Sequence, residues 1–121
     1  MPYVDGFIVA VPKKNLAVYA ALSKKCGKIW REYGALDYRE WVAEDVNVGK
    51  LTSFPRSVKL KPGETVVFAW ITYKSRAQRD RINAKVMADP RLKSMGMGDM
   101  KSMPFDPKRM IYGGFKSLVK V

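Results

Sequence analysis

Apolar residues alternate with polar ones along several short stretches of the chain, and two longer stretches carry apolar residues at helical spacing instead. Residues 3–11 and 64–73 are apolar on both alternating faces. A strand of this kind is covered on both sides. We therefore predict that these two stretches form the central strands of one sheet.

Apolar residues at helical spacing predict a helix that begins after Pro12. We expect this helix to end at Gly34, because glycine commonly ends a helix. The apolar positions of this helix are Leu16, Tyr19, Leu22, Cys26, Ile29, Trp30 and Tyr33. Ser75 and Gln78 form a capping box, which predicts the start of a second helix that ends or restarts at Pro90.

Two more strands are predicted at the edges of the sheet. Residues 35–45 place Leu36, Tyr38, Glu40 and Val42 on one face and the mixed set Asp37, Arg39 and Trp41 on the other. Such polarity is typical of an edge strand. Residues 110–119 alternate again, and residues 46–63 form a loop in which Val58–Leu60 is predicted to pair as a short extended segment.

The resulting order, β-α-β-β-α-β, predicts an α+β fold of ferredoxin-like type with an antiparallel four-stranded sheet. We expect one domain over residues 1–121, because a chain of 121 residues is the length of one domain. In this fold both helices cover the same face of the sheet. The other face of the central strands is apolar as well, so we expect a second copy of the chain to cover it in a homodimer.

The segment from Tyr112 to Phe115, YGGF, resembles part of an RNA-recognition motif. Its second glycine places the two aromatic residues on opposite faces of a strand, where they cannot stack on one RNA chain. It also falls on the last strand, whereas the motif belongs on the third. We therefore interpret these residues as a strand with a glycine bulge or a close backbone approach.

The composition of the chain limits the catalytic groups, metal ligands and partners that can be expected. The chain has no histidine, which removes the commonest general base and the usual zinc and haem ligand, and we expect no metal or cofactor. A single cysteine fits a reducing compartment, and the first residues lack the pattern of a secretory signal, so we expect a cytoplasmic protein without membrane spans. The net charge of +12 favours contact with polyanions without defining a site.

Several long motifs carry a resemblance to a known family: MPYVDGF, GKIWREYGALDYRE, TSFPRSVKLKPGETVVFAWITYKSRAQRDRINAKVMADPRL and KSMPFDPKRMIYGGFK. Over nearly the whole chain the sequence resembles the YbaA-like family, small bacterial proteins of unknown function (domain of unknown function family 1428). The resemblance implies a cytosolic, dimeric α/β barrel in which two ferredoxin-like sheets face each other. Proteins of this architecture include cofactor-free monooxygenases and small degradative enzymes, an analogy of fold that identifies no reaction.

Candidate ligand-binding residues are the aromatic and polar side chains of the strands. The aromatic members could line a pocket, or could belong to the core or the dimer interface. The set is Tyr38, Arg39, Trp41, Trp70 and Tyr112. Asp5 lies inside an apolar strand and is a weak candidate for a catalytic base, with Arg39 or Arg109 as its expected partner; the favoured interpretation is a solvated or ion-paired residue.

Two other groups are interpreted as structural. Cys26 falls on an apolar helix stripe and is expected to be buried and inert. A methionine-rich loop, with Met95, Met97, Met100 and Met103, lacks the cysteine or histidine that would accompany a copper site. We expect a loosely packed loop.

We expect, as the leading hypothesis, a homodimer that binds or transforms a small metabolite in an apolar and aromatic pocket. The alternative is a basic accessory protein that binds RNA or another polyanion non-specifically. That alternative would use the densest run of positive charge, which includes Arg76, Arg79, Arg81 and Lys85. A third option is a surface that serves only a partner protein, and it predicts no pocket.

Overall fold

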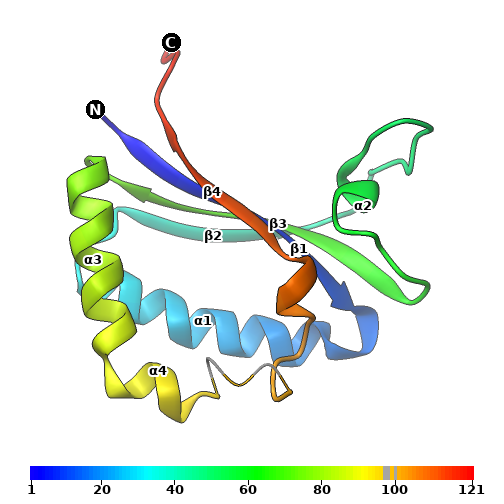
Figure 1. Ribbon diagram of the computed structural model, residues 1–121, viewed down its shortest axis with the longest axis horizontal. Helices are drawn as coiled ribbons and strands as arrows, with labels where there is room; N and C mark the ends of the chain where they lie inside the picture. The colour runs from blue at the N-terminus through cyan, green and yellow to red at the C-terminus, as the bar shows by residue number, and fades with distance from the viewer. Residues whose placement is uncertain (97–98, 100) are drawn as a thin grey trace.

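The computed structural model describes residues 1–96, 99 and 101–121 (Figure 1). In chain order the elements are β1 (Tyr3–Pro12), the 3₁₀ turn η1 (Lys13–Asn15), α1 (Leu16–Glu32), β2 (Asp37–Val42), α2 (Phe54–Ser57), β3 (Glu64–Tyr73), α3 (Arg76–Ala88), α4 (Pro90–Ser94), the 3₁₀ turn η2 (Pro107–Arg109) and β4 (Ile111–Lys116). The main elements follow the predicted β-α-β-β-α-β order. The protein is therefore an α+β protein.

The described strands form one antiparallel sheet in the order β2-β3-β1-β4. The two predicted central strands are central: β1 and β3 pair with each other along ten residues each, from Tyr3 opposite Tyr73 to Pro12 opposite Glu64. The two strands predicted at the edges of the sheet are β2 and β4, and both lie there. This arrangement is consistent with the ferredoxin-like fold predicted from the sequence.

One face of the sheet is covered by α1 and α3, which lie on the same side of it in Figure 1. The core forms where the odd-numbered residues of β1 and β3 meet the helices. Its buried members include Val9, Val11, Cys26, Ile29, Trp30, Ile71, Tyr73, Ile82 and Val86. Burial of a large apolar side chain contributes roughly 1.5–3 kcal/mol, so this face supplies most of the stability of the fold.

The structure confirms the residues that were predicted to begin and end the helices. Ser75 Oγ accepts a hydrogen bond from the Gln78 backbone N–H at 3.1 Å, which caps α3. Gly34 has a φ of 113°, a left-handed conformation that glycine adopts without strain. A new helix, α4, begins at Pro90, and Asp89 Oδ1 caps it by accepting a hydrogen bond from the Arg91 backbone N–H.

The prediction of an extended pairing at Val58–Leu60 is wrong. These residues form a turn that directly follows the short helix α2, which is capped by Ser53, whose Oγ accepts a hydrogen bond from the Arg56 backbone N–H at 3.1 Å. Lys59 then turns the chain with a φ of 49°. Val58 is apolar for another reason, because it is buried against Ala10 and Val66 on the face of the sheet opposite α1 and α3.

The glycines of β4 permit a close approach rather than a bulge. The strand pairs with β1 in unbroken register from Ile111 to Lys116. A side chain at Gly114 would collide with the ring and hydroxyl of Tyr3. Tyr112 and Phe115 point to opposite faces of the sheet, since they lie opposite Phe7 and Val4 of β1.

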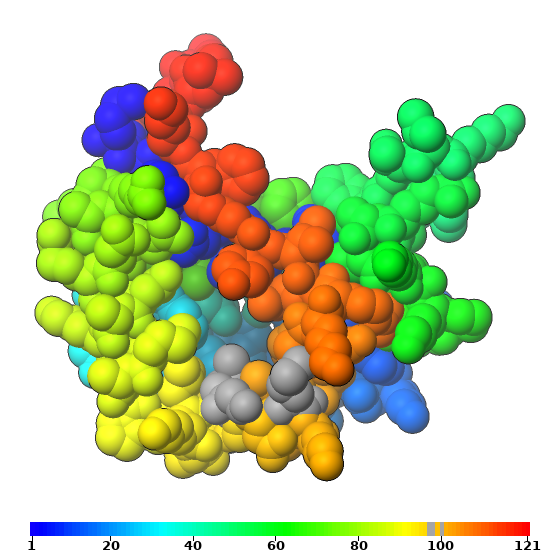
Figure 2. Space-filling model, in the orientation of Figure 1, coloured from blue at the N-terminus to red at the C-terminus, as the bar shows by residue number. Residues whose placement is uncertain are grey.

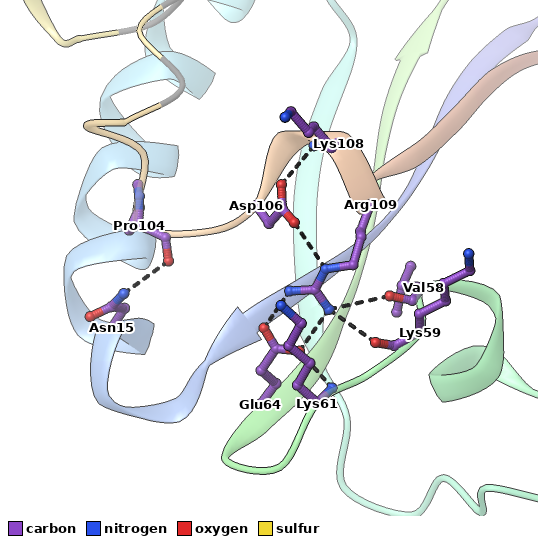
Figure 3. Close-up of polar contacts among 9 residues, drawn as sticks. All are labelled: Asn15, Val58, Lys59, Lys61, Glu64, Pro104, Asp106, Lys108 and Arg109. Carbon is purple, nitrogen blue, oxygen red and sulfur yellow. Dashed lines mark hydrogen bonds and ion pairs between the residues drawn. The ribbon is translucent and has the colours of Figure 1, made fainter.

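The segment before β4 is anchored by Arg109, as Figure 3 shows. Its guanidinium donates to both carboxylate oxygens of Glu64, at 2.6 and 2.8 Å, and to Asp106 Oδ2 at 3.0 Å. It also donates to the backbone carbonyl of Lys59 at 3.1 Å. These contacts hold residues 101–110 beside the helices, where they complete the wall of a pocket.

Candidate functional site

A pocket of about 400 Å³ lies on the helix-covered side of the sheet. Figure 2 shows it as a hollow between α3 and the segment that leads into β4. Its apolar lining comes from strands, helices and the segment before β4, and includes Phe7, Val9, Leu22, Trp30, Ala69, Ile71, Met87, Met103, Phe105, Met110 and Tyr112. This size and lining are typical of a site for a small organic molecule.

Local sequence explains how the floor of the pocket forms. The alternation of β2 turns Tyr38 and Glu40 toward the helices. Gly27 allows α1 to lie directly on Tyr38, because a Cβ at this position would be 2.6 Å from the Tyr38 ring. Ala69 of β3 lies opposite Glu40 of β2, and the small side chain of Ala69 leaves space above the sheet.

The first polar group of the pocket is centred on the half-buried carboxyl group of Glu40. The Tyr19 hydroxyl donates a hydrogen bond to Glu40 Oε1. The Tyr38 hydroxyl shares a hydrogen bond of 3.1 Å with Ser23 Oγ. Burial raises the pKa of Glu40, and hydrogen bonds from Tyr19 and Tyr38 offset part of that rise.

The second polar group is centred on Asp5. Arg79 Nη1 lies 2.8 Å from Asp5 Oδ1, and the Arg79 guanidinium also lies 5.0 Å from the centre of the Tyr3 ring. Asp5 is 6% exposed, and burial raises its pKa although Arg79, Asn83 and Tyr73 all favour the ionised form. Asp5 is therefore an ion-paired carboxylate that lines one end of the pocket.

The partner predicted for Asp5 is wrong. Arg39 pairs with Asp37 at 3.0 Å, and Arg109 pairs with Glu64 and Asp106. Both predicted partners were arginines expected on neighbouring strands. The actual partner, Arg79, reaches Asp5 and Tyr3 of β1 from the first turns of α3.

The five predicted ligand-binding residues divide between the two faces of the sheet. Tyr38 and Tyr112 lie on the helix-covered face and line the pocket. Arg39, Trp41 and Trp70 lie on the opposite face, where the two indole rings are 5.4 Å apart and the Arg39 guanidinium is 6.0 Å from the Trp41 ring. Arg39 and Trp70 also contribute atoms to the pocket wall.

The face opposite the helices, which we call the open face, is apolar and largely uncovered. Its exposed side chains are Trp41, Phe54, Phe68, Ile111 and Phe115. Phe68 packs at 6.0 Å from Phe54 and at 5.6 Å from Trp70, so Phe54, Phe68, Trp70 and Trp41 form one continuous cluster. Only one end of this face is covered within the described chain, by the segment around Val58.

The predicted polyanion-binding residues do not share one surface. Arg76, Arg81 and Lys85 are exposed on α3. Arg79 turns inward, with a side chain that is 19% exposed, and binds Asp5 and Asp80. One of the four charges is thus committed to the fold.

The described sulfur-containing residues Cys26 and Met103 lie in the packed interior and in the pocket lining, respectively. Cys26 is 4% exposed, and burial raises the pKa of its thiol. Met103 lines the pocket, and Met97 and Met100 lie outside the described residues. Within residues 1–96, 99 and 101–121, no three histidine, cysteine or acidic side chains gather at metal-binding distance, and no helix is long and apolar enough to cross a membrane.

Sequence reasoning missed Glu40, Tyr19, Ser23 and Asn83 as pocket residues. Glu40 carried a signal, because it is a charged residue between the apolar members of the predicted face, Leu36, Tyr38 and Val42. Tyr19 was assigned to the apolar helix stripe. Its hydroxyl has a role only because β2 lies under that turn of α1.

Comparisons with known proteins agree with the fold and identify the family. The structure of Rv0793 from Mycobacterium tuberculosis superimposes with a TM-score of 0.59 at 13% identity, covering 99% of this chain and 98% of that chain, which shows a shared fold. The uncharacterized protein YbaA of Escherichia coli (strain K12) is 49% identical over 119 residues and 98% of both chains, as is that of Shigella flexneri. Residues 2–107 match the family described as "Protein of unknown function (DUF1428)". The chain therefore belongs to the DUF1428 family.

Proposed function

We propose that this protein binds, or transforms, a small and mainly apolar metabolite in the pocket between α3 and β4. The observation that supports the proposal most directly is the combination of a cavity of about 400 Å³ with an apolar lining and two separate polar groups. Sites for small organic molecules commonly combine an apolar body with a few polar groups that fix orientation.

The two polar groups define the kind of ligand that fits. Asp5 of β1 lies opposite Ile71 of β3, which in turn lies opposite Tyr38 of β2. Glu40 lies two residues further along β2, opposite Ala69. Strand spacing and rise then put the two Cα atoms roughly 12 Å apart. A ligand with one or two rings and polar substituents at its ends would reach both groups.

Native mass spectrometry of the protein purified gently from its own host tests this proposal. We expect a bound small molecule in the wild type and its loss in Ala69→Phe, because the added ring projects into the pocket. Thr72→Val is the matched control, since it changes the opposite face of the same strand, and it should retain the molecule. Equal adducts in all three proteins would place the ligand elsewhere.

We also propose that the protein is a homodimer in which the open faces of two sheets pack together. Large exposed apolar patches mark protein interfaces, and a second copy of the same sheet would present a matching apolar patch. Light scattering should give the mass of a dimer for the wild type and that of a monomer for Phe68→Lys. A wild-type monomer at micromolar concentration would reject this part of the proposal.

The polyanion alternative uses the exposed cations of α3. It predicts RNA that remains with the protein at low salt, leaves at moderate salt, and is lost when Arg76, Arg81 and Lys85 are neutralised together. The same purification distinguishes the two hypotheses if nucleic-acid absorbance is recorded at both salt concentrations.

A further inference from the structure

We infer that Glu40 is a catalytic residue that exchanges a proton with the ligand of the pocket, and that Tyr19 and Tyr38 are positioning residues for it. This inference rests on the proposed function, because it requires that the pocket receives a ligand. It adds a class of reaction, namely proton abstraction from a weakly acidic C–H group of an apolar molecule.

Glu40 differs from the other carboxyl groups that are buried or half-buried in the described chain. Each of the others is paired with an arginine: Asp5 with Arg79, Asp37 with Arg39, Glu64 and Asp106 with Arg109, and Asp89 with Arg91. Glu40 has tyrosine hydroxyl groups instead. An arginine would hold the carboxylate ionised and occupy its lone pairs, so its absence leaves Glu40 free to act as a base.

The position of Glu40 gives a ligand access to its carboxyl group. The residue lies in the pocket lining, opposite Ala69 of β3, which in turn lies opposite Phe7 of β1. Ala69 leaves open space beside the carboxyl group, and Phe7 offers an aromatic ring one strand further. A flat ligand on this floor would place its edge against Glu40.

The hydrogen bonds fix the direction of the carboxyl group. Tyr19 donates from α1 to Oε1, and Tyr38 is itself held by Ser23 of α1 at 3.1 Å. A carboxylate has two oxygens and about four acceptor sites, so these donors leave acceptor capacity for the ligand. The arrangement orients the base without neutralising it.

The electrostatics agree with this role. The titratable groups that face Glu40 are Tyr19 and Cys26 on α1 and Tyr38 on β2, and burial raises the pKa of each of them. All three are neutral near pH 7, while β1 and β3 present the uncharged Phe7 and Ala69. The pKa of Glu40 is raised by burial, which makes its carboxylate a stronger base than an exposed one.

The proposed step balances without a further reactant. Glu40 takes the proton from a carbon that lies between a carbonyl group and a C=C double bond, and the electron pair of the broken C–H bond moves toward the carbonyl oxygen to give a dienolate. The protonated Glu40 then returns the proton to the far carbon of the former double bond, and the electrons return from the oxygen to form the shifted C=C bond. The product is an isomer, so no oxidant or reductant is required.

A chemical probe can test the base without knowledge of the natural ligand. The probe 5-nitrobenzisoxazole is a flat, apolar molecule with one acidic C–H group. When a base removes that proton, the electron pair of the C–H bond completes a carbon–nitrogen triple bond, the N–O bond breaks, and the oxygen leaves as a coloured nitrophenolate. Glu40 later loses the proton to water.

We expect saturable turnover of the probe by the wild-type protein, with a loss of about 100-fold or more in Glu40→Gln, which keeps the shape and the hydrogen bond from Tyr19. The surface variant Glu44→Gln is the matched control and should leave the rate unchanged. In Tyr19→Phe a donor to the carboxylate is lost, so the pKa of Glu40 should rise and the midpoint of the pH–rate profile should move upward. A merely structural role for Tyr19 would leave that midpoint in place.

Separate outcomes distinguish this inference from the proposed function. Line broadening of the probe's proton NMR signals measures binding independently of turnover. Binding that persists in Glu40→Gln with equal turnover in both proteins, or loss of turnover in Asp5→Asn alone, would overturn the role of Glu40 and leave the pocket intact. No binding of the probe to wild type would reject the pocket and the inference together.

Discussion

Replacing Arg79 by methionine removes the cation that accompanies the buried carboxylate of Asp5. The two side chains are 19% and 8% exposed, and their charged atoms are 2.8 Å apart. At an effective dielectric constant of about 20, charges about 4 Å apart interact by about 4 kcal/mol. Because the variant leaves Asp5 buried without a counter-ion, we expect its free energy of unfolding to fall by about 3–5 kcal/mol near neutral pH.

The loss should depend on pH in a defined direction. Asp5 titrates near about 3.9 in the unfolded chain of both proteins. Without Arg79 the folded state holds the Asp5 proton more tightly than the wild type does, so protonation favours the folded variant. The difference in unfolding free energy between wild type and variant should therefore be largest near neutral pH and shrink as pH falls through the raised pKa of Asp5 in the variant.

Urea denaturation followed by tryptophan fluorescence, at about pH 7.5 and about pH 5, measures both effects. The double variant Asp5→Asn, Arg79→Met should recover much of the stability, because it leaves no unpaired charge. Arg76→Met, an exposed position on the same helix, should change stability by no more than about 0.5 kcal/mol. A loss that is equal at both pH values and is not recovered in the double variant would refute the reasoning.

Three further predictions concern other contacts. Gly27→Ala brings a methyl group to 2.6 Å from the Tyr38 ring. The resulting overpacking should lower the free energy of unfolding by about 1–3 kcal/mol, which outweighs any gain in helix propensity. A raised Tm in calorimetry would contradict this prediction. Cys26 should react with a thiol reagent far more slowly in the native protein than in denaturant, since burial raises the pKa of its thiol; equal rates in the two states would contradict that burial. Glu64→Gln should cost about 3–5 kcal/mol near pH 7. Arg109 lowers the pKa of Glu64, so this difference should shrink in urea titrations as pH falls below about 4.3, and a constant difference would count against the ion pair.

The strands could be predicted because their patterns are dictated by two-sided burial. The sequence of β3 is apolar on both faces because one face packs on the helices and the other carries the exposed aromatic cluster. The Ser75 cap and the Gly34 turn are local chemistry, so they were also visible in the sequence. The pairing at Val58–Leu60 was predicted wrongly because Val58 is apolar for a tertiary reason, namely contact with Ala10.

The candidate site was only partly predictable, since it depends on which face of the sheet a side chain joins. Alternation on β2 showed that Tyr38 and Trp41 lie on opposite faces, but the set of ligand-binding candidates combined both. The partnership of Arg79 with Asp5 spans 74 residues, and no local pattern encodes it. Likewise, the surroundings of Glu40 arise only when α1 packs on β2.

The central claim is that the ligand site lies on the helix-covered face of the sheet, beside Glu40, rather than on the open face. A crystal structure of the protein with 2-naphthol, a flat apolar molecule with one hydroxyl group, tests it most directly. The account predicts the rings between Phe7 and α1, with the hydroxyl group within hydrogen-bonding distance of a Glu40 carboxylate oxygen. Naphthol seated against Trp41 and Trp70, with the pocket beside Glu40 empty, would contradict it.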